Sequence, residues 1–529
     1  MRRMAMAMAA IVAAALVLGA CASTDRTDGA APPATAAPKV GGSLTYALDA
    51  DPNGFSPTRN AWDTAGLLVA MAIYDPWAAF DASGEVRPYL AERFAHSDDY
   101  RTWTLTLRTG VVFSDGTALT ADAAKATLDA LRNSAVTGFP LGNIDTVAAP
   151  DPATVVITMK QPWASFLAIL TGQVGVVVLP SLLESADGST RPVGTGPFRL
   201  TSWEIDEATE VVRNERYWRP GLPRLDKVDF VVVPDGRDRV AKLANGDIDV
   251  AGVAQAADVA AMDGLVGQGV DVVHDGGAAE ATMIMLNNAQ PPFDDPLMRQ
   301  AAAAATDIPA LAKVGGWPAD RLANGPFMRS SPWYRSTSYP AHDADRARTL
   351  VQQYEATHGP VEVRLAGSYA PDLVQLIAQQ WNDAGISTTV ELQDAKKFPL
   401  TLVTGRYDAA YVYYFGAPDP DMLRYFWSSE TVRPVGGISI NLARYQDAET
   451  DAALDAGRAS ADPAARQAAY ATVQRRFAEQ LPFIWLYHVQ WTFGSRAGVH
   501  DARNVTLPDG SPAMPYVVGV HNLTETWRD

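Results

Sequence analysis

Residues 87–128 read RPYLAERFAHSDDYRTWTLTLRTGVVFSDGTALTADAAKATL. In this stretch Trp103, Leu105 and Leu107 alternate with threonines, which is the period of a strand with one buried face. A Phe-Ser-Asp-Gly segment then indicates a hairpin turn. Thr120 follows as a helix N-cap, ahead of apolar residues at helical spacing. The stretch therefore predicts a strand, a hairpin and a helix in succession.

A second stretch, residues 361–392, predicts a strand, a helix and another strand. Its first and last parts alternate apolar with polar residues, and its middle carries Leu373, Ile377 and Trp381 on one helical face before Gly385. A strand–helix–strand unit favours parallel pairing of the two strands within an α/β lobe.

Two further elements stand out near the ends of the chain. Alternation of Leu44, Tyr46 and Leu48 predicts a strand, and Asp462 with Pro463 behind it is typical of a capped helix start.

The composition bounds the class of protein. The chain has 529 residues, of which 47% are hydrophobic, 19% charged and 9% aromatic. This length predicts about three to four domains, and the composition excludes a mainly disordered chain. Acidic residues number 60 against 43 basic ones, which gives a formal net charge of -17. Because such a charge repels a phosphate backbone, we expect no nucleic-acid partner.

An export signal is expected at the N-terminus. Two arginines at positions 2 and 3 precede an uncharged segment rich in Ala, Met, Val and Leu. It ends in Leu-Gly-Ala-Cys at Cys21, which resembles the bacterial lipobox, whose cysteine is acylated. We therefore expect residues 1–20 to be a lipoprotein signal peptide, Cys21 to carry a lipid anchor, and residues 21–40 to be a flexible tether. A retained membrane-spanning anchor is the alternative.

This N-terminal signal predicts an extracytoplasmic protein attached to the cell membrane by lipid, in the periplasmic space or on the outer face of the plasma membrane. Cys21 is the only cysteine, so an internal disulfide is excluded.

Four blocks of sequence, in order along the chain, resemble one family. The first is the stretch at 87–128. The second combines VGTGPFRL from Val193 with RNERYW from Arg213 and LANGDIDV from Leu243, the third is NNAQPPFDDPLMRQA from Asn287, and the weaker fourth is RYDAAYVYYFGAPDPD from Arg406 with closing patterns near the C-terminus. Together they resemble the family 5 extracellular solute-binding proteins, the receptors of ABC importers for dipeptides, oligopeptides, nickel chelates and some oligosaccharides.

The resemblance implies an α/β fold of the two-lobed periplasmic-binding-protein type (type II, cluster C) with an extra inserted subdomain. Lobe I would comprise residues 41–81, 191–275 and 498–529, the inserted subdomain residues 82–190, and lobe II residues 276–497. The lobes would close around a small-molecule or short-peptide solute and present it to the permease subunits of an importer. The resemblance also implies a monomer that has no cofactor and is not an enzyme.

The family places its pocket between the lobes, here at residues 49–62 and 411–427. The candidate ligand-binding residues are Asn53, Phe55, Trp62, Tyr413, Tyr414, Phe415, Gly416, Asp419, Trp427 and Arg433. Core packing is the alternative for the aromatic residues, and a surface position is the alternative for Arg433. Aromatic walls with few charges suit a solute with apolar or sugar-like faces.

Gly416 departs from the family pattern. Peptide-binding members resembling this chain carry an aspartate at this position, four residues before Pro420, and it pairs with the α-ammonium of the cargo. A buried ammonium needs a paired anion, so a free peptide N-terminus would be poorly held unless Asp419 or Asp421 replaces that carboxylate. We therefore predict a cargo other than a free peptide: an oligosaccharide, a modified peptide or another small organic solute.

Four alternatives stay open at this point. A peptide receptor of the dipeptide or oligopeptide type is the first, and a surface lipoprotein acting as an adhesin or signal receptor on the same fold is the second. An enzyme is the third, although the sequence carries no nucleophile elbow, His-Glu-x-x-His or Walker loop. A protein-bound metal is the fourth, but the seven histidines show no close ligand spacing, so we expect none.

Overall fold

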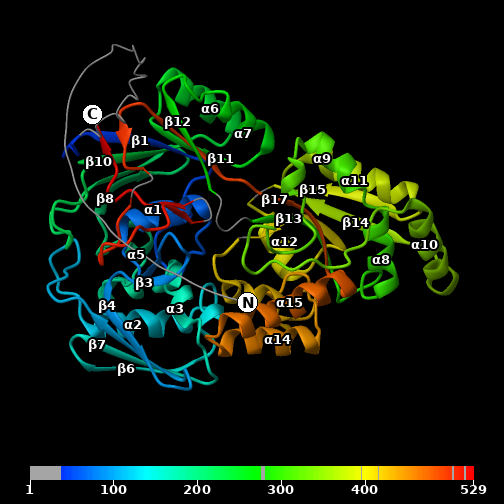
Figure 1. Ribbon diagram of the computed structural model, residues 1–529, viewed down its shortest axis with the longest axis horizontal. Helices are drawn as coiled ribbons and strands as arrows, with labels where there is room; N and C mark the ends of the chain where they lie inside the picture. The colour runs from blue at the N-terminus through cyan, green and yellow to red at the C-terminus, as the bar shows by residue number, and fades with distance from the viewer. Residues whose placement is uncertain (1–36, 276–279, 395, 415, 503–504, 518–519) are drawn as a thin grey trace, which may run out of the picture. The chain divides into compact units, whose positions relative to one another are not determined.

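The structure is a computed structural model that describes residues 37–275, 280–394, 396–414, 416–502, 505–517 and 520–529. The chain divides into two units, residues 1–38 and 39–529, and all described helices and strands belong to the second unit (Figure 1). The expected signal peptide and Cys21 lie outside the described residues. Within the described ranges, no helix combines the length and apolar character needed to cross a bilayer.

A seven-stranded sheet forms the centre of what we call lobe I; helices α1 (Thr64–Ile73), α6 (Gly236–Asn245) and α7 (Ala256–Asp263) pack on it. Its strand order is β12-β18-β11-β1-β10-β9-β8. β1 pairs in parallel with β10 and β11, and the other pairs are antiparallel. The strands are β1 (Ser43–Leu48), β8 (Phe198–Glu204), β9 (Ala208–Arg213), β10 (Lys227–Val232), β11 (Val250–Val253), β12 (Val270–His274) and β18 (Thr492–Arg496).

Both faces of the lobe I sheet are covered. The predicted strand is confirmed as β1, and Leu44, Tyr46 and Leu48 are buried against helix α1 (Thr64–Ile73). On the opposite face Ala47 packs with helices α6 (Gly236–Asn245) and α7 (Ala256–Asp263). Residues from both sides of β1 are therefore in the core, as expected for a central strand with parallel neighbours.

A four-stranded antiparallel sheet forms the inserted subdomain. Its order is β4-β5-β7-β6, with β4 (Ala91–His96), β5 (Thr102–Leu107), β6 (Ile144–Asp151) and β7 (Thr154–Met159). Trp103, Leu105 and Leu107 are buried on one face of β5, where they pack with helix α2 (Ala121–Arg132). The Thr120 side chain accepts a hydrogen bond from the Ala123 N–H and caps this helix. The predicted strand and helix are confirmed.

A five-stranded sheet with its helices forms lobe II. Its order is β15-β14-β16-β13-β17. The strands are β13 (Ala281–Leu286), β14 (Glu362–Gly367), β15 (Ser387–Leu392), β16 (Ala409–Tyr414) and β17 (Phe483–His488). The predicted parallel unit is confirmed, because β14 pairs in parallel with β15 after the chain crosses over through α11 (Pro371–Asp383).

Helices cover the two faces of the lobe II sheet (Figure 1). One face packs with α8 (Pro296–Ala305), α9 (Ile308–Gly315), α10 (Ala344–His358) and α11. The other packs with α12 (Phe398–Thr404), α14 (Ala448–Ala459) and α15 (Pro463–Gln480). The predicted late helix is α15, and the Asp462 side chain accepts from the N–H groups of Ala464 and Ala465 at its start.

Two segments connect the lobe I and lobe II sheets, one between β12 and β13 and one between β17 and β18. The described ends of the first segment contact the second, because the Val489 N–H donates to the Glu280 carbonyl (2.7 Å) and the Asp275 N–H donates to the Trp491 carbonyl (2.8 Å). The expected end of lobe II at residue 497 needs correction here. β18 pairs with β11 and β12, so the chain has returned to lobe I before Thr492. The other domain boundaries stay predictions.

Shorter elements complete the described chain. Gly194 and Gly196, just before β8, form a turn packed closely against the end of α1. The Gly196 N–H donates to the Ile73 carbonyl (2.9 Å), and an added Cβ at Gly196 would lie 2.5 Å from that carbonyl. The remaining elements are β2 (Ala78–Phe80), β3 (Val86–Pro88), α3 (Phe166–Ile169), α4 (Pro180–Leu183), α5 (Asp187–Thr190), α13 (Arg424–Trp427), β19 (Val499–His500), β20 (Tyr516–Val517), β21 (Val520–His521), β22 (Trp527–Arg528), and 3-10 turns at Phe139–Leu141, Gln173–Gly175, Ala319–Arg321, Pro420–Leu423 and Ser429–Thr431.

Candidate functional site

A cavity of about 560 Å³ lies where lobe I, the inserted subdomain and lobe II meet. Lobe I contributes the start of α1, β2 and residues of the C-terminal segments 507–517 and 520–524. The inserted subdomain contributes residues around 136–140 and 169–174, and lobe II contributes residues 416–426 and 440–442. This volume is in the range of small-molecule sites, and the lining from both lobes is what a closing receptor requires.

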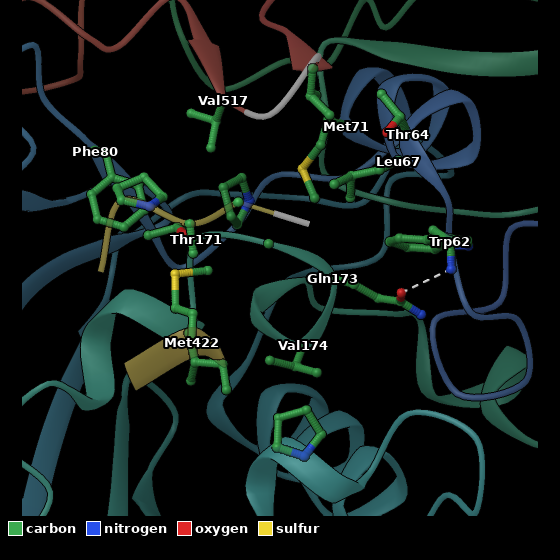
Figure 2. A pocket seen from close by; sticks show the side chains of 18 of the residues that line it. Trp62, Thr64, Leu67, Met71, Phe80, Thr171, Gln173, Val174, Met422 and Val517 are labelled. Atoms are coloured by element: carbon green, nitrogen blue, oxygen red, sulfur yellow. Dashed lines mark hydrogen bonds between the residues drawn. The ribbon is translucent and has the colours of Figure 1, made fainter. Parts of the chain in front are cut away.

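The cavity wall is mainly apolar. Figure 2 shows Met71, Met422 and Val517, which come from different parts of the chain, pointing toward the same space. Leu67, Phe80 and Val174 extend this wall. The described residues that line the cavity include no Lys or Arg. A solute carboxylate would therefore find no cation in this lining to pair with.

Asp75 is one of two carboxylates in the wall, and both of its oxygens are engaged. The Trp218 Nε1–H donates to Asp75 Oδ2 (2.7 Å), and the Tyr217 hydroxyl donates to Oδ1 (3.2 Å). Burial raises the pKa of Asp75 to about 7, against the lowering effect of these hydrogen bonds. Tyr217 and Trp218, from the RNERYW block, thus support the wall from behind.

Asp63 is the other carboxylate of the wall, and it caps a helix. Its Oδ1 accepts the Gly66 N–H (2.8 Å) at the first turn of α1. An N-cap carboxylate compensates free N–H groups and the positive end of the helix dipole. Asp63 therefore has a structural role that does not depend on a solute.

Trp62 is the predicted aromatic residue that does line the cavity. Its Nε1–H donates to the Gly54 carbonyl (3.0 Å), and its ring stacks on Tyr74 with centroids 6.0 Å apart. The Trp62 backbone N–H donates to Gln173 Oε1 (3.1 Å), as Figure 2 shows. Gln173 in turn donates to the carbonyl of Asn60 (2.6 Å). The loop that carries Trp62 is thus tied to the inserted subdomain.

Gly416 also lines the cavity, and neither neighbouring aspartate supplies a free carboxylate. Asp419 accepts two hydrogen bonds from the Arg466 guanidinium (2.8 and 2.7 Å). Asp421, 3% exposed, accepts from Trp163 Nε1 (2.6 Å) and Arg458 Nε (2.8 Å), among others. Both carboxylates are therefore neutralised by side chains of the protein itself.

Two of the predicted aromatic residues lie in the core instead. Phe55 has no exposed surface and packs edge-on against Trp203 (5.1 Å between centroids). Trp427 is 3% exposed and packs against Phe327 and Phe477. Neither residue lines the cavity. Both aromatic residues therefore belong to the core, which was the alternative for them.

The side chains of Asn53 and Arg433 form hydrogen bonds with backbone carbonyls of the loops that carry them. The Asn53 amide donates to the Ala61 carbonyl (2.8 Å) and closes the loop before α1. The exposed Arg433 guanidinium donates to the carbonyls of Glu430 (2.9 Å) and Val432 (2.7 Å). Neither lines the cavity, and Arg433 has the surface position that was its alternative.

The tyrosine cluster is only partly described. Tyr413 lies on β16, is 49% exposed and contacts Tyr369 edge-on (5.5 Å between centroids), outside this cavity. Tyr414 is described by its backbone in β16 alone, and Phe415 lies outside the described residues.

His521 is a residue of the wall that the sequence pattern did not single out as a ligand contact. It lies on β21, is 1% exposed, and neither ring nitrogen has a partner in good hydrogen-bond geometry; the Ala502 backbone is the polar group that acts on the ring. Burial lowers its pKa to about 4, so the ring is neutral near neutral pH. A buried donor or acceptor without a partner costs about 1–3 kcal/mol. No local pattern around His521 predicts this placement.

Within the described ranges, no group of three or more His, Cys, Asp or Glu side chains is arranged to hold a metal ion.

Comparison with known proteins identifies the family. Residues 85–434 match the model of the bacterial extracellular solute-binding proteins, family 5 (middle). The chain is 30% identical over 454 residues to the glutathione-binding protein GsiB of Salmonella choleraesuis strain SC-B67, an alignment that covers 80% of this chain and 85% of the relative.

Two solved structures share the fold. The protein AgaA of A. tumefaciens R10, in complex with agropinic acid, has a TM-score of 0.81 at 24% identity and covers 92% of this chain and 99% of its own. The ABC transporter-associated protein DppA of Helicobacter pylori, in complex with the peptide STSA, has a TM-score of 0.81 at 21% identity and covers 93% and 98%. This chain belongs to the family 5 extracellular solute-binding proteins.

The family assignment confirms the two-lobed α/β fold and the class of function expected from the sequence. The chain is an extracytoplasmic solute-binding protein of the kind that serves ABC importers.

Proposed function

We propose that this chain captures one small solute in the cavity between its lobes and delivers it, chemically unchanged, to the permease of an ABC importer. The observation that carries the proposal is the cavity itself, which both lobes and the inserted subdomain line together. A solute that contacts all three parts has a higher affinity for the closed state than for the open one. Solute-bound and solute-free receptor then differ in shape, which a permease can read.

The cargo of this receptor is not a peptide with a free N-terminus. Gly416 supplies no carboxylate to the cavity, and Asp419 and Asp421 are engaged by arginines. An ammonium group transferred into this site would find no carboxylate at position 416, and the two carboxylates of the wall, Asp63 and Asp75, already accept hydrogen bonds from the protein. The candidate classes are an oligosaccharide, a modified peptide or another small organic solute. This distinguishes the proposal from a peptide receptor of the same fold.

We also propose the finer features that the sequence predicts. Residues 1–20 are removed as a signal peptide, Cys21 is acylated and holds the chain to the membrane, and residues 21–40 act as its tether. Tethering keeps the receptor near the permease and raises its effective concentration there. The receptor acts as a monomer and performs no reaction on its solute.

Isothermal titration calorimetry with a library of di- and tripeptides, in free and N-acetylated forms, tests the proposed cargo class. Free peptides should show no binding at micromolar concentrations. A micromolar Kd for free di- or tripeptides overturns the cargo assignment. Hydrolysis or other conversion of a bound solute by the purified protein overturns the assignment as a binding protein.

A further inference from the structure

Among the described residues, the wall of the cavity contains two buried polar side chains with unmet hydrogen-bonding capacity, Thr137 and His521, of which His521 has the larger capacity. His521 lines the cavity, and neither ring nitrogen has a partner in good hydrogen-bond geometry, although the Ala502 backbone lies close enough to act on the ring. Buried polar groups in proteins are almost always hydrogen-bonded, so an exception that borders a cavity points to a missing partner. A neutral imidazole offers one N–H donor and one acceptor to that partner.

The surroundings of His521 hold the ring without satisfying it. Tyr516 contacts the imidazole at 4.8 Å between ring centroids, and Tyr46 contacts it at 6.0 Å. β20 and β21 pair antiparallel, with Tyr516 opposite His521. The Tyr46 hydroxyl is also buried and has no partner. His521 therefore lies among aromatic rings, next to a second buried polar atom without a partner, the Tyr46 hydroxyl.

The rest of the wall favours an apolar solute without charge. The described lining has no Lys or Arg, and Asp63 and Asp75 each accept at least one hydrogen bond from a group of the protein. Met71, Met422 and Met514 line the wall, and their flexible thioethers adapt to irregular apolar shapes. An anionic solute would find no cation in this lining, and a cationic one would have to share Asp63 or Asp75 with the protein groups that already bond them.

We infer that His521 is the polar anchor of the cargo, and that the cargo is an uncharged, mainly apolar small molecule with a hydroxyl, carbonyl or amide group that bonds the imidazole. The inference rests on the proposed function and narrows it. Of the cargo classes proposed above, it favours a small organic solute over an oligosaccharide, whose many hydroxyl groups need many polar partners.

A matched series of probes tests the charge preference. Diphenylhexatriene, a fluorescent hydrocarbon without polar atoms, reports on occupation of the cavity. 1-Octanol, octanoate and octylammonium share one chain length and differ in head group. 1-Octanol should displace diphenylhexatriene at concentrations at least about tenfold lower than either charged analogue.

A matched pair of variants tests the anchor. His521→Phe keeps an aromatic ring but removes both nitrogens, and it should weaken 1-octanol binding about tenfold while leaving diphenylhexatriene binding within about twofold. His96→Phe, on the exposed β4, is the control and should change neither affinity. His521→Gln, which keeps a donor and an acceptor, should retain part of the 1-octanol affinity. The probe series on the unaltered chain remains decisive if His521→Phe does not fold.

The outcomes separate this inference from the proposed function. Tighter binding of octanoate or octylammonium than of 1-octanol, or equal loss of 1-octanol and diphenylhexatriene in His521→Phe, overturns the inference and leaves the receptor function standing. If none of the four probes binds the unaltered chain, the inference and the assignment of this cavity as the solute site both fall.

Discussion

At the scale of single residues, Glu280 is a carboxyl group that the fold withdraws from water. It lies at the start of the lobe II sheet, just after the first connection between the lobes, and is 1% exposed. Its Oε2 accepts the Trp491 Nε1–H (3.2 Å) from the second connection, and its Oε1 has no partner. Burial raises the pKa of Glu280 to about 8. The carboxyl is therefore protonated at neutral pH.

This carboxyl links stability to pH. The pKa of Glu280 is about 8 in the folded chain against an ordinary 4.5. Between these values the folded state holds a proton that the unfolded state has lost, so the free energy of unfolding falls as pH rises. Glu280→Gln should remove this contribution, which is at most about 1.4 kcal/mol per pH unit. Urea unfolding between about pH 5 and 8 measures it.

The exposed Glu362 on β14 supplies the control for this measurement. Glu362→Gln should keep the slope of the unaltered chain. Identical slopes in the Glu280→Gln variant and the unaltered chain would contradict the assignment of a buried, protonated carboxyl.

A substitution at Gly416 tests whether the missing carboxylate determines the class of cargo. Gly416→Asp places a carboxylate in the cavity wall, where an ammonium group can pair with it. We expect affinity for free dipeptides to rise at least about tenfold, with little change for their N-acetylated forms. Gly416→Asn is the matched control, because it has nearly the same size but no charge. Equal affinities of the two variants, measured by calorimetry, would show that charge at this position does not select the cargo.

At the scale of elements, α15 illustrates how local signals determine a helix. Pro463 occupies its first turn, and Asp462 caps it through the N–H groups of Ala464 and Ala465. The buried side of the helix, which includes Phe477, packs on the lobe II sheet. Asp462→Ala should lower the free energy of unfolding by about 1 kcal/mol, because the cap is lost.

Urea unfolding with Asp462→Asn and Asp98→Ala provides the comparison. Asn retains the capping oxygen and should restore most of the stability. The exposed Asp98 lies in a turn away from any helix start, so its substitution should have little effect. An Asp462→Ala variant as stable as the unaltered chain would show that tertiary packing alone holds α15.

The elements also show where sequence reasoning ends. β5 and α2 are predictable because alternation and a capping threonine act within a few residues. β18 was placed in the wrong lobe, because its sheet is decided by pairing with β11 and β12, far away in the sequence. Phe55 and Trp62 have similar apolar character, yet only Trp62 borders the cavity. Hydrophobic patterning indicates that a residue is buried but not whether a core or a cavity lies beside it.

At the scale of the whole molecule, one polar cluster joins lobe II to the inserted subdomain beside the cavity. Asp421 of lobe II accepts from Trp163 Nε1 (2.6 Å) and from the Ser165 hydroxyl (2.8 Å). Arg458 on α14 donates to the same carboxylate (2.8 Å) and lies 4.2 Å from the Trp163 ring. The Ala164 N–H donates to the Arg458 carbonyl (2.8 Å). These contacts do not involve a solute, so they hold lobe II against the inserted subdomain by themselves.

Removing the charge of this cluster should favour opening. Asp421→Asn weakens the bonds to Arg458 and Trp163, so the solute-free receptor should have a larger radius of gyration in small-angle scattering. Because part of the binding energy must then close the lobes, solute affinity should fall about three- to tenfold. Asp419→Asn is the control, since Asp419 pairs with Arg466 within lobe II. An unchanged radius of gyration in Asp421→Asn would contradict the role of this cluster.

The candidate site follows the same division between local and long-range information. Gly416 was predictable because a family pattern fixes its position relative to Pro420. His521 was not, because the C-terminal segment reaches the cavity only after the chain has returned to lobe I through β18. Its role depends on the cavity wall around it, which no local pattern encodes.

Native mass spectrometry of the full chain, purified from the cells that make it, tests the central claim most directly. The account predicts a noncovalent complex with one uncharged organic molecule per chain, which is recovered intact when the protein is denatured. A bare protein mass under conditions that preserve such complexes, or a solute recovered as reaction products, would contradict it.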